Sequence, residues 1–398
     1  MTPEQSALQA AIEAHKGGRL AEAEAGYRTI LQQNPGDGDA LNFLGMLRCQ
    51  SGDLQGGAQL LRAAVEALPG NAHAWVNLAN VLVMTGATDE ARTALTKATE
   101  LAPDMAIAWF NLGVCLGRCR RPRDGAAALH KALTLEPGYI PAYKSLAMIY
   151  YRLGDYAQGA QVYREWLAQE PGNVTAQHML AATSGQATPT RADHRYIREM
   201  FDDFASSFDE SLRLLDYCAP QLIAAALTEA LGPAARLEVL DAGCGTGLCA
   251  ALVRPIARRL VGVDLSASMV QRARERGLYD ELVVTELCEF IRARPRSFDV
   301  IYSADTLVYF GALEEPLAAM RGSLKGPAMV AFTLEELEQT PTEQQYALQP
   351  HGRYAHAEPY VRSVLAGSGF TRVAIGRSVL RRELGRDVGG LVVQAWAS

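Results

Sequence analysis

Long apolar runs, an excess of basic residues and paired cysteine motifs are all missing from this 398-residue sequence. No stretch approaches the roughly 20 apolar residues that a membrane-spanning helix requires, so we expect no membrane segment. Acidic residues outnumber basic ones in both halves of the chain, and the net charge is −6. A surface that binds nucleic acid through its phosphates is therefore not expected.

The seven cysteines are scattered and odd in number. Cys115 and Cys119 lie four residues apart without a partner histidine, which favours helix packing over a metal site. The first residues lack a basic region followed by an apolar one, the pattern of a secretory signal. These features predict a cytoplasmic protein that binds no metal.

Several residue types recur every 34 positions in the first half of the chain. The period is marked by prolines at positions 35, 69, 103, 137 and 171. A bulky column holds Leu41, Trp75, Trp109 and Tyr143, and a small column holds Gly45, Ala79, Gly113 and Ala147. Bulky residues form a helix stripe, and small residues let a partner helix approach closely. A constant period of this length predicts stacked helical hairpins.

This pattern resembles the tetratricopeptide repeat, in five units over about residues 4–173, with residues 174–183 as a capping helix. Two positions depart from it: Ala7 stands in the bulky column, and Arg120 stands where other units have a turn glycine. The resemblance implies an all-α solenoid over residues 1–183.

It also implies a concave groove that binds a peptide, protein or carrier-protein partner. The candidate groove residues are Asn42, Met46, Asn77, Asn80, Phe110, Asn111, Lys144 and Tyr151. Asparagine suits a peptide backbone because its amide both donates and accepts hydrogen bonds. The alternative is that these asparagines are solvated or cap helices.

Residues 184–192 are small and polar without periodicity, which predicts a linker before a second domain at 193–398. In that domain an apolar run gives way to Asp241 and then to glycines at 243, 245 and 247. A second apolar run ends in Asp264. Two strands ending in acids, with a glycine loop between them, predict a doubly wound sheet that holds a nucleoside. The rival dinucleotide motif is G-x-G-x-x-G, which the alternating glycines do not match.

These residues resemble the cofactor motifs of class I S-adenosylmethionine (SAM)-dependent methyltransferases. The resemblance implies a Rossmann-like α/β domain with a seven-stranded, mostly parallel sheet and SAM as cofactor. It implies that Asp241 faces the methionyl part of SAM and that Asp264 binds the ribose hydroxyls. The other cofactor residues it implies are Phe208, Gly243, Gly245, Gly247, Leu265, Met269, Glu286, Leu287 and Ser303. Glu289 is an alternative to Glu286, and Met269 has helix–sheet packing as its alternative role.

Phe201, Phe204 and Phe208 are spaced three and four apart, so they share one helix face. The stripe either packs on the sheet or covers the cofactor as a lid.

Candidate catalytic residues are Asp305, Tyr309 and His356, and candidate substrate residues are His351, Arg353 and Tyr354. Asp305 follows the fourth strand, where it either orients a nucleophile or caps a loop. The histidines are candidate bases, although methyl transfer from a sulfonium needs only alignment and late proton loss. Arg353 either binds an anionic substrate group or forms a surface ion pair.

We therefore predict a SAM-dependent methyltransferase whose repeat array recruits a peptide, protein or carrier-bound substrate. Two alternatives remain open. One is a methyltransferase for free small molecules whose array serves oligomerisation or scaffolding. The other is a repeat adaptor that senses SAM without turnover.

Overall fold

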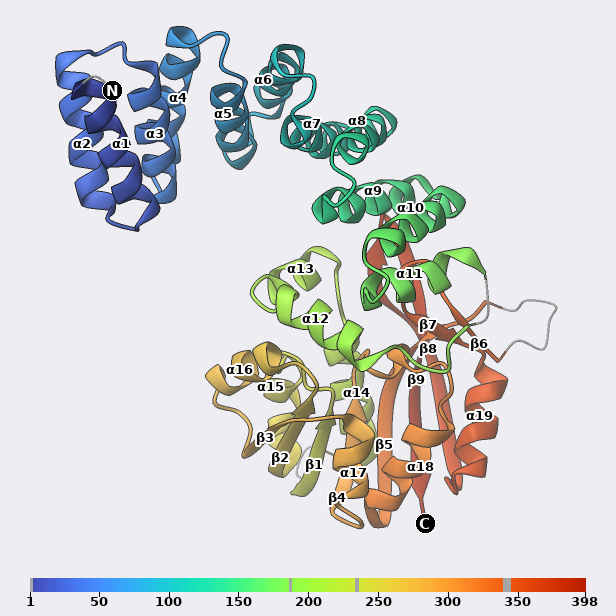
Figure 1. Ribbon diagram of the computed structural model, residues 1–398. Coiled ribbons are helices and arrows are strands. Elements are labelled where there is room, and N and C mark those ends of the chain that lie inside the picture. The colour runs from blue at the N-terminus through green and yellow to red at the C-terminus, as the bar shows by residue number, and fades with distance from the viewer. Residues whose placement is uncertain (1–2, 186–187, 233–235, 339–344) are drawn as a thin grey trace. The chain divides into compact units, whose positions relative to one another are not determined.

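The computed structural model describes residues 3–185, 188–232, 236–338 and 345–398 (Figure 1). The chain divides into two compact units, Met1–Gln169 and Glu170–Ser398. Each unit is described by itself below.

All the regular secondary structure in the described part of the first unit is α-helical. The helices are α1 (Pro3–Lys16), α2 (Leu20–Gln33), α3 (Gly38–Gln50), α4 (Leu54–Ala67), α5 (Ala72–Met84), α6 (Thr88–Leu101), α7 (Ala106–Arg118), α8 (Pro122–Leu135), α9 (Ile140–Leu153) and α10 (Tyr156–Gln169). The turns between paired helices contain Gly52, Gly86 and Gly154. All three adopt a positive φ, a conformation that glycine takes without steric cost. Arg120 takes the same conformation, with a φ of 57°, at the position where the other units have glycine.

The columns of the 34-residue period have direct physical roles. A Cβ on Gly113 would lie 2.9 Å from the carbonyl oxygen of Gly125, so the two helices of that unit approach too closely for a side chain. Side chains of the bulky column also donate hydrogen bonds to the carbonyl group of the recurring proline. Trp75 Nε1 donates to the Pro69 carbonyl at 3.0 Å, and the Tyr143 hydroxyl donates to the Pro137 carbonyl at 3.0 Å. The period therefore fixes both the helix spacing and the turn that precedes each unit.

Helix α11 (Val174–Ser184) continues the period but belongs to the second compact unit. Gln177, which lies 34 residues after Tyr143, donates to the Pro171 carbonyl at 2.9 Å. The sequence predicts a capping helix before a boundary at 183, whereas the compact units divide at 169. The reason is that Val174 packs in a buried cluster with residues that follow the linker, among them Tyr196 and Tyr309.

The second unit contains a nine-stranded sheet (Figure 1). Its strands are β1 (Leu237–Ala242), β2 (Ala257–Asp264), β3 (Glu281–Val284), β4 (Phe298–Ser303), β5 (Leu324–Glu336), β6 (Tyr346–Leu348), β7 (Tyr354–His356), β8 (Arg372–Glu383) and β9 (Arg386–Ala397). Its helices after α11 are α12 (His194–Phe204), α13 (Phe208–Leu214), α14 (Ala219–Leu231), α15 (Ala250–Val253), η1 (Arg254–Ile256), α16 (Ala267–Glu275), α17 (Leu287–Arg292), η2 (Leu307–Tyr309), α18 (Glu314–Ser323) and α19 (Glu358–Gly367).

The strand order is β3-β2-β1-β4-β5-β7-β6, with β9 antiparallel to β5 and β8 antiparallel to β9. The predicted α/β domain with a mostly parallel sheet is confirmed, but the predicted number of seven strands is too low. The two additional strands, β6 and β7, form a short antiparallel hairpin between β5 and α19. That hairpin pairs with the last two residues of β5, Glu335 and Glu336.

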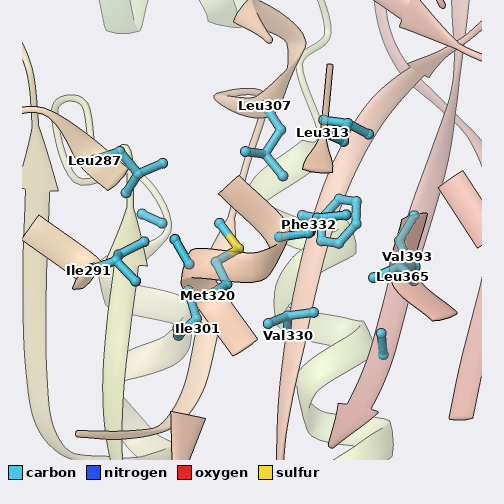
Figure 2. Packing of buried hydrophobic residues seen from close by; sticks show 14 of the residues in the cluster. Leu287, Ile291, Ile301, Leu307, Leu313, Met320, Val330, Phe332, Leu365 and Val393 are labelled. Atoms are coloured by element: carbon cyan, nitrogen blue, oxygen red, sulfur yellow. The ribbon is translucent and has the colours of Figure 1, made fainter. Parts of the chain in front are cut away.

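Alternate residues of the central strands pack on opposite faces of the sheet, as the two-residue strand period requires. One face carries Leu240, Ile301, Val330 and Phe332 against α17, α18 and α19 (Figure 2). The other carries Val239, Val300 and Met329 against α14 and α15. Burial on both faces explains why the strands read as continuous apolar runs that end abruptly in polar residues.

Candidate functional site

A cavity of about 230 Å³ lies at the carboxyl ends of the parallel strands, within the second unit. The glycine loop after β1 and the residues after β2, β3 and β4 line it, as do α12, α13 and the end of β8. This edge of a doubly wound sheet is where such folds bind ligands, because each strand end delivers a loop to the same place.

Gly243 is required at its position in the loop. Its φ is 85°, and a Cβ there would lie 2.0 Å from Oγ1 of Thr306. The next cavity glycine, Gly245, donates its N–H to Oδ2 of Asp264 at 2.8 Å. Oδ1 of Asp264 accepts from the backbone N–H of Ser266 at 2.9 Å. The loop and the acid at the end of β2 thus form one hydrogen-bonded wall, where burial raises the pKa of Asp264.

Asp241 lies beneath that loop and is not among the cavity-lining residues. Its Oδ2 accepts the hydroxyls of Tyr279 at 2.6 Å and Tyr302 at 2.7 Å. Burial raises the pKa of Asp241 to about 7. Ser303 is also buried, and its hydroxyl donates to the Ala242 carbonyl at 2.8 Å. Both residues are held by buried hydrogen bonds and neither lines the cavity, whereas the sequence predicts that they contact the cofactor.

The three phenylalanines of the aromatic stripe line the cavity, but the prediction that they share one helix face is wrong, because α12 ends at Phe204 and α13 begins at Phe208. Phe208 packs edge-on against Phe201 and Phe204, with ring centroids 6.0 Å and 5.5 Å away. On the same helix as Phe201 and Phe204, Asp202 accepts from the Ser266 hydroxyl at 2.5 Å and from the Ser268 N–H at 3.1 Å. The stripe therefore faces the cavity while an acid on the same helix holds it to the start of α16.

Asp209 makes the second attachment, on α13. Its Oδ1 accepts the Thr246 hydroxyl at 2.5 Å, and its Oδ2 pairs with Arg276. Thr246 belongs to the glycine loop, so both loops that line the cavity hold the helical cover. The phenylalanines line the cavity and Phe201 also packs edge-on against Tyr309, with ring centroids 5.6 Å apart, so the lid over a cofactor stays a prediction.

At the β3 end the lining residues include Leu265, Met269, Glu286 and Leu287. Glu286 caps α17 by accepting the Glu289 N–H at 2.8 Å, whereas the Glu289 side chain is exposed. Oε1 of Glu286 accepts from Arg191 at 3.1 Å. Of the two alternative acids, Glu286 is therefore the one that lines the cavity, and Arg191 reaches it from the linker.

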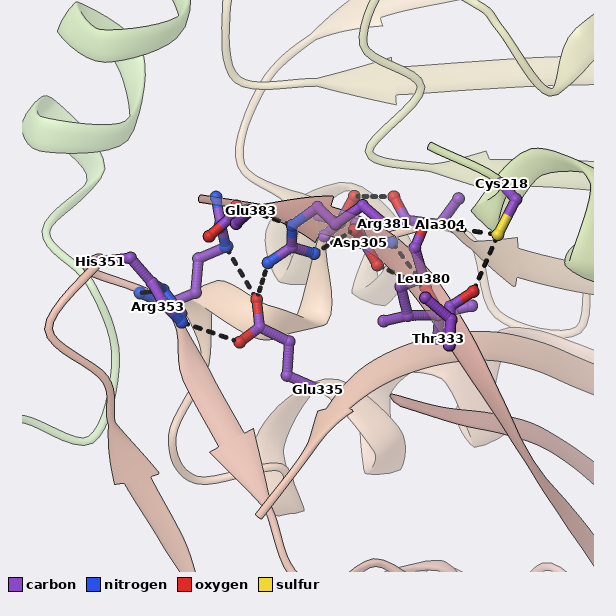
Figure 3. Close-up of polar contacts among 12 residues, drawn as sticks. Cys218, Ala304, Asp305, Thr333, Glu335, His351, Arg353, Leu380, Arg381 and Glu383 are labelled. Atoms are coloured by element: carbon purple, nitrogen blue, oxygen red, sulfur yellow. Dashed lines mark hydrogen bonds and ion pairs between the residues drawn. The ribbon is translucent and has the colours of Figure 1, made fainter. Parts of the chain in front are cut away.

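A buried ionic network borders the cavity at the end of β4 (Figure 3). Arg381, which is 2% exposed, donates to Asp305 at 3.0 Å, to Glu383 at 2.8 Å and to Glu335. Arg353 donates to Glu335 at 2.8 Å and also to Glu383. Asp305 itself has a φ of 53° and accepts the Thr333 hydroxyl at 2.8 Å.

Three carboxylates thus surround two arginines, and His351 Nε2 lies 3.1 Å from Oε2 of Glu335. Burial alone would raise the pKa of Glu335, but His351 and the two arginines hold it well below its usual range. Asp305 lines the cavity, but its charge is paired with Arg381 in the wall, which agrees better with a positioning role than with a free base. Arg353 lines the cavity, and it is also held in a buried ion pair with Glu335. The sequence predicts either an arginine that binds an anionic substrate group or one in a surface ion pair, and neither prediction describes this arrangement fully.

Of the remaining candidates, Tyr309 lines the cavity, whereas His351, Tyr354 and His356 do not. The Tyr354 hydroxyl donates to the Pro189 carbonyl at 2.9 Å. His356 is fully buried, and its Nε2 lies 2.9 Å from the Phe310 carbonyl oxygen. Burial lowers the pKa of His356 to about 4. A histidine held in this way supports the wall of the site, so its position does not agree with a predicted role as a base.

The sequence-based prediction missed several lining residues, among them Arg191, His194, Tyr217, Arg381 and Glu383. They belong to the linker, the start of α12, the loop before α14 and the β8 hairpin, none of which carries a local motif. Only long-range pairing, such as Arg382 N–H to the Leu215 carbonyl at 2.7 Å, brings these segments to the cavity.

Comparison with known families agrees with this architecture. A profile described as a methyltransferase domain matches residues 239–326, and profiles described as tetratricopeptide repeats match residues 8–72, 49–112 and 120–183. The chain joins tetratricopeptide repeats to a methyltransferase domain. The repeats supply a protein-interaction module, and the methyltransferase match covers the glycine loop, β1–β4 and the start of β5.

Similar proteins are methyltransferases as well. Human methyltransferase-like protein 27 is 36% identical over 117 residues, 29% of this chain and 46% of that protein. A demethylmenaquinone methyltransferase from Clavibacter sepedonicus is 32% identical over 24% of this chain and 38% of its own length. The chain therefore spans less than half of each of these two relatives. A malonyl-[acyl-carrier protein] O-methyltransferase from Geobacter sulfurreducens is 25% identical over 46% of this chain and 73% of its own.

Among solved structures, the crystal structure of MamA is 22% identical, with a TM-score of 0.39, over 40% of this chain and 94% of that one. No helix in the described part of the chain has the length and apolar character needed to cross a bilayer.

Proposed function

We propose that this protein is a SAM-dependent methyltransferase whose repeat array recruits a peptide, protein or carrier-bound methyl acceptor. The observation that carries the proposal is the wall formed by Gly243, Gly245 and Asp264. A loop without Cβ atoms lets a nucleoside approach the backbone, and a buried carboxylate beside it can accept ribose hydroxyls.

The residues present fit this cofactor. Asp264 would hold the ribose, and Leu265, Met269 and Leu287 would form apolar walls for the base. When bound, SAM supplies an electrophilic methyl group on a sulfonium. The phenylalanines of the lid would exclude water and offer ring faces to a cation.

The acceptor end is bordered by Tyr217, Tyr309 and the Arg353–Arg381 network. The two arginines are fixed by buried ion pairs, so they can orient an acceptor without rearrangement. The name of the Geobacter sulfurreducens relative refers to a carrier-bound acyl substrate, which supports the choice of a carrier-bound acceptor for this chain.

The proposal is tested by calorimetry with S-adenosylhomocysteine and, separately, with NADH. We expect micromolar binding of the first and none of the second. Asp264→Asn should raise the dissociation constant about thirtyfold, because it removes a charge-assisted hydrogen bond worth about 2 kcal/mol. Asp104→Asn, at an exposed site in the first unit, is the matched control. Binding of NADH alone would reject the proposal, and a gain of one methyl mass on a co-purified partner would support the acceptor class.

A further inference from the structure

Two polar groups that line the cavity lack partners in the protein. Tyr309 is only 8% exposed, and its hydroxyl makes no hydrogen bond with the residues that the structure describes. Arg353 and Arg381 both donate to Oε1 of Glu383, whereas Oε2 of Glu383 has no partner among those residues. Polar groups placed in this way in a largely apolar cavity are available to a ligand.

The wall that carries Glu383 has more negative than positive charge. In the ionic network of Figure 3, three carboxylates surround two guanidinium groups, which leaves one negative charge uncompensated. His351, 3.1 Å from the carboxylate of Glu335, balances this charge only when it is protonated. A carboxylate on a bound ligand would be repelled by this wall, whereas an ammonium group would be attracted to it.

Both unpartnered groups lie close to the charges of this network. Although burial alone would raise the pKa of Glu383, Arg353 and Arg381 hold it below its usual range, so its carboxylate is ionised at neutral pH. The pKa of Tyr309 is raised chiefly by burial, and both arginines and Asp305 also act on it, because its hydroxyl lies within reach of their charges. The cavity therefore offers an anionic acceptor and a neutral hydroxyl at the same wall.

The sheet order places this wall at the end of the cavity where methyl transfer would take place. In the order β3-β2-β1-β4, the proposed ribose contact Asp264 ends β2, and the apolar residues proposed as walls for the base follow β2 and β3. A nucleoside bound in this way directs its 5′ carbon, which carries the sulfur, toward β1 and β4. Tyr309 belongs to η2, which follows β4, and the network of Glu383 begins at the end of the same strand.

We propose that the methyl acceptor is an amine whose nitrogen donates to Glu383 Oε2, with the Tyr309 hydroxyl as a second contact for the acceptor. This inference rests on the proposed SAM dependence and names the acceptor group. Such an amine can belong to a peptide, a protein or a carrier-bound aminoacyl group. A carboxylate only accepts hydrogen bonds, so Oε2 suits a group that carries N–H bonds. Because its pKa is low, Glu383 is expected to orient this nitrogen and not to remove its proton.

The test is calorimetry of the full chain with four analogues of S-adenosylhomocysteine in which a nitrogen replaces the sulfur. This nitrogen carries a 2-aminoethyl, 2-hydroxyethyl, carboxymethyl or propyl arm, which extends into the space of the acceptor. The aminoethyl analogue should bind the wild type about tenfold more tightly than the propyl analogue, and the carboxymethyl analogue should bind more weakly than either. Glu383→Gln, which keeps an oxygen for the arginines, should remove this preference and leave binding of the propyl analogue unchanged.

Two further variants separate this role from a structural one. Tyr309→Phe removes a hydroxyl that bonds to none of the described residues. It should therefore weaken the aminoethyl analogue about three- to tenfold, while S-adenosylhomocysteine binding and the melting temperature stay unchanged. Glu336→Gln removes a carboxylate that pairs with Arg377 and is not among the cavity-lining residues, so it should change none of these affinities.

Three results would overturn the inference. They are tightest binding of the carboxymethyl analogue, tightest binding of the hydroxyethyl analogue, and equal weakening of all four analogues by Glu383→Gln. Failure of the wild type to bind S-adenosylhomocysteine would instead reject the proposed function.

Discussion

Three aspartates at the strand ends show how the environment sets the role of one residue type. Burial raises the pKa of Asp241, Asp264 and Asp305 alike. Their partners differ: tyrosine hydroxyls for the first, backbone N–H groups for the second, and Arg381 with Thr333 for the third. Only the second leaves the acid beside a loop that a ligand can approach, so only Asp264 suits direct contact with the ribose.

His356 provides a prediction at the same scale. Its pKa is lowered from 6.5 to about 4 by burial, so between these values the unfolded chain takes up a proton that the folded chain refuses. The free energy of unfolding should therefore fall as the pH falls from about 6.5 to about 4, by up to about 1.4 kcal/mol per pH unit. His356→Gln keeps a donor for the Phe310 carbonyl and should flatten this dependence in urea unfolding curves. An unchanged slope, or an equal flattening by His73→Gln, would contradict the assignment.

At the scale of elements, α12 and α13 act as one cover with an apolar inner face and acidic attachments. Asp202 supplies a carboxylate to the N-terminal end of α16, where it meets the Ser268 N–H and the favourable end of the helix dipole. Asp209 attaches the next helix to Thr246 of the glycine loop. Both attachments end on segments that line the cavity, so ligand binding and closure of the cover should be coupled.

Asp202→Ala should loosen this cover and raise the dissociation constant of S-adenosylhomocysteine about tenfold, through faster release. The neighbouring Asp203→Ala is the matched control because that side chain is exposed on the same helix. Surface plasmon resonance would measure the association and dissociation rates of S-adenosylhomocysteine for each variant. Equal effects of the two variants would show that the attachment through Ser266 and Ser268 does not hold the cover.

At the scale of the whole molecule, α11 belongs to two patterns at once. It carries the 34-residue period of the array, yet its apolar side packs within the methyltransferase unit through Val174 and Ala182. His178 adds a hydrogen bond of 2.8 Å to the Gly352 carbonyl and stacks on Tyr196 at 4.1 Å. The helix is therefore part of the scaffold that supports Tyr309 on the cavity wall.

Two fragments test this assignment. Residues 170–398 should unfold cooperatively and bind S-adenosylhomocysteine, whereas residues 188–398, which lack α11, should lose several kcal/mol because Val174, His178 and Ala182 leave apolar surface uncovered. Thermal unfolding with and without S-adenosylhomocysteine measures both effects. Equal stability of the two fragments would show that α11 does not belong to this unit. Full turnover on an isolated acceptor by residues 170–398 would favour the free small-molecule alternative for the array.

Much of this protein follows from local pattern. The repeat period, the turn glycines and the strand–loop–strand signal around Gly243 and Asp264 predicted both folds and the part of the cavity wall that the glycine loop and Asp264 form. These features depend on residues close together in the chain, where helix and strand periods and positive φ determine structure directly.

The opposite wall of the cavity, around Arg353 and Arg381, depended on the tertiary fold. Arg381 reaches Asp305 across 76 residues because β8 pairs with β9, which in turn pairs with β5 beside β4. His194 meets Glu286 because the linker bonds to the residues after β4. The sequence predicts that Asp241 contacts the cofactor and that His356 is a candidate base. In the structure both side chains are buried, and Asp241 accepts from tyrosine hydroxyls while His356 pairs with a backbone carbonyl. Both residues therefore have supporting roles. Local sequence does not encode which distant segment will cover a side chain, and that covering decides its chemistry.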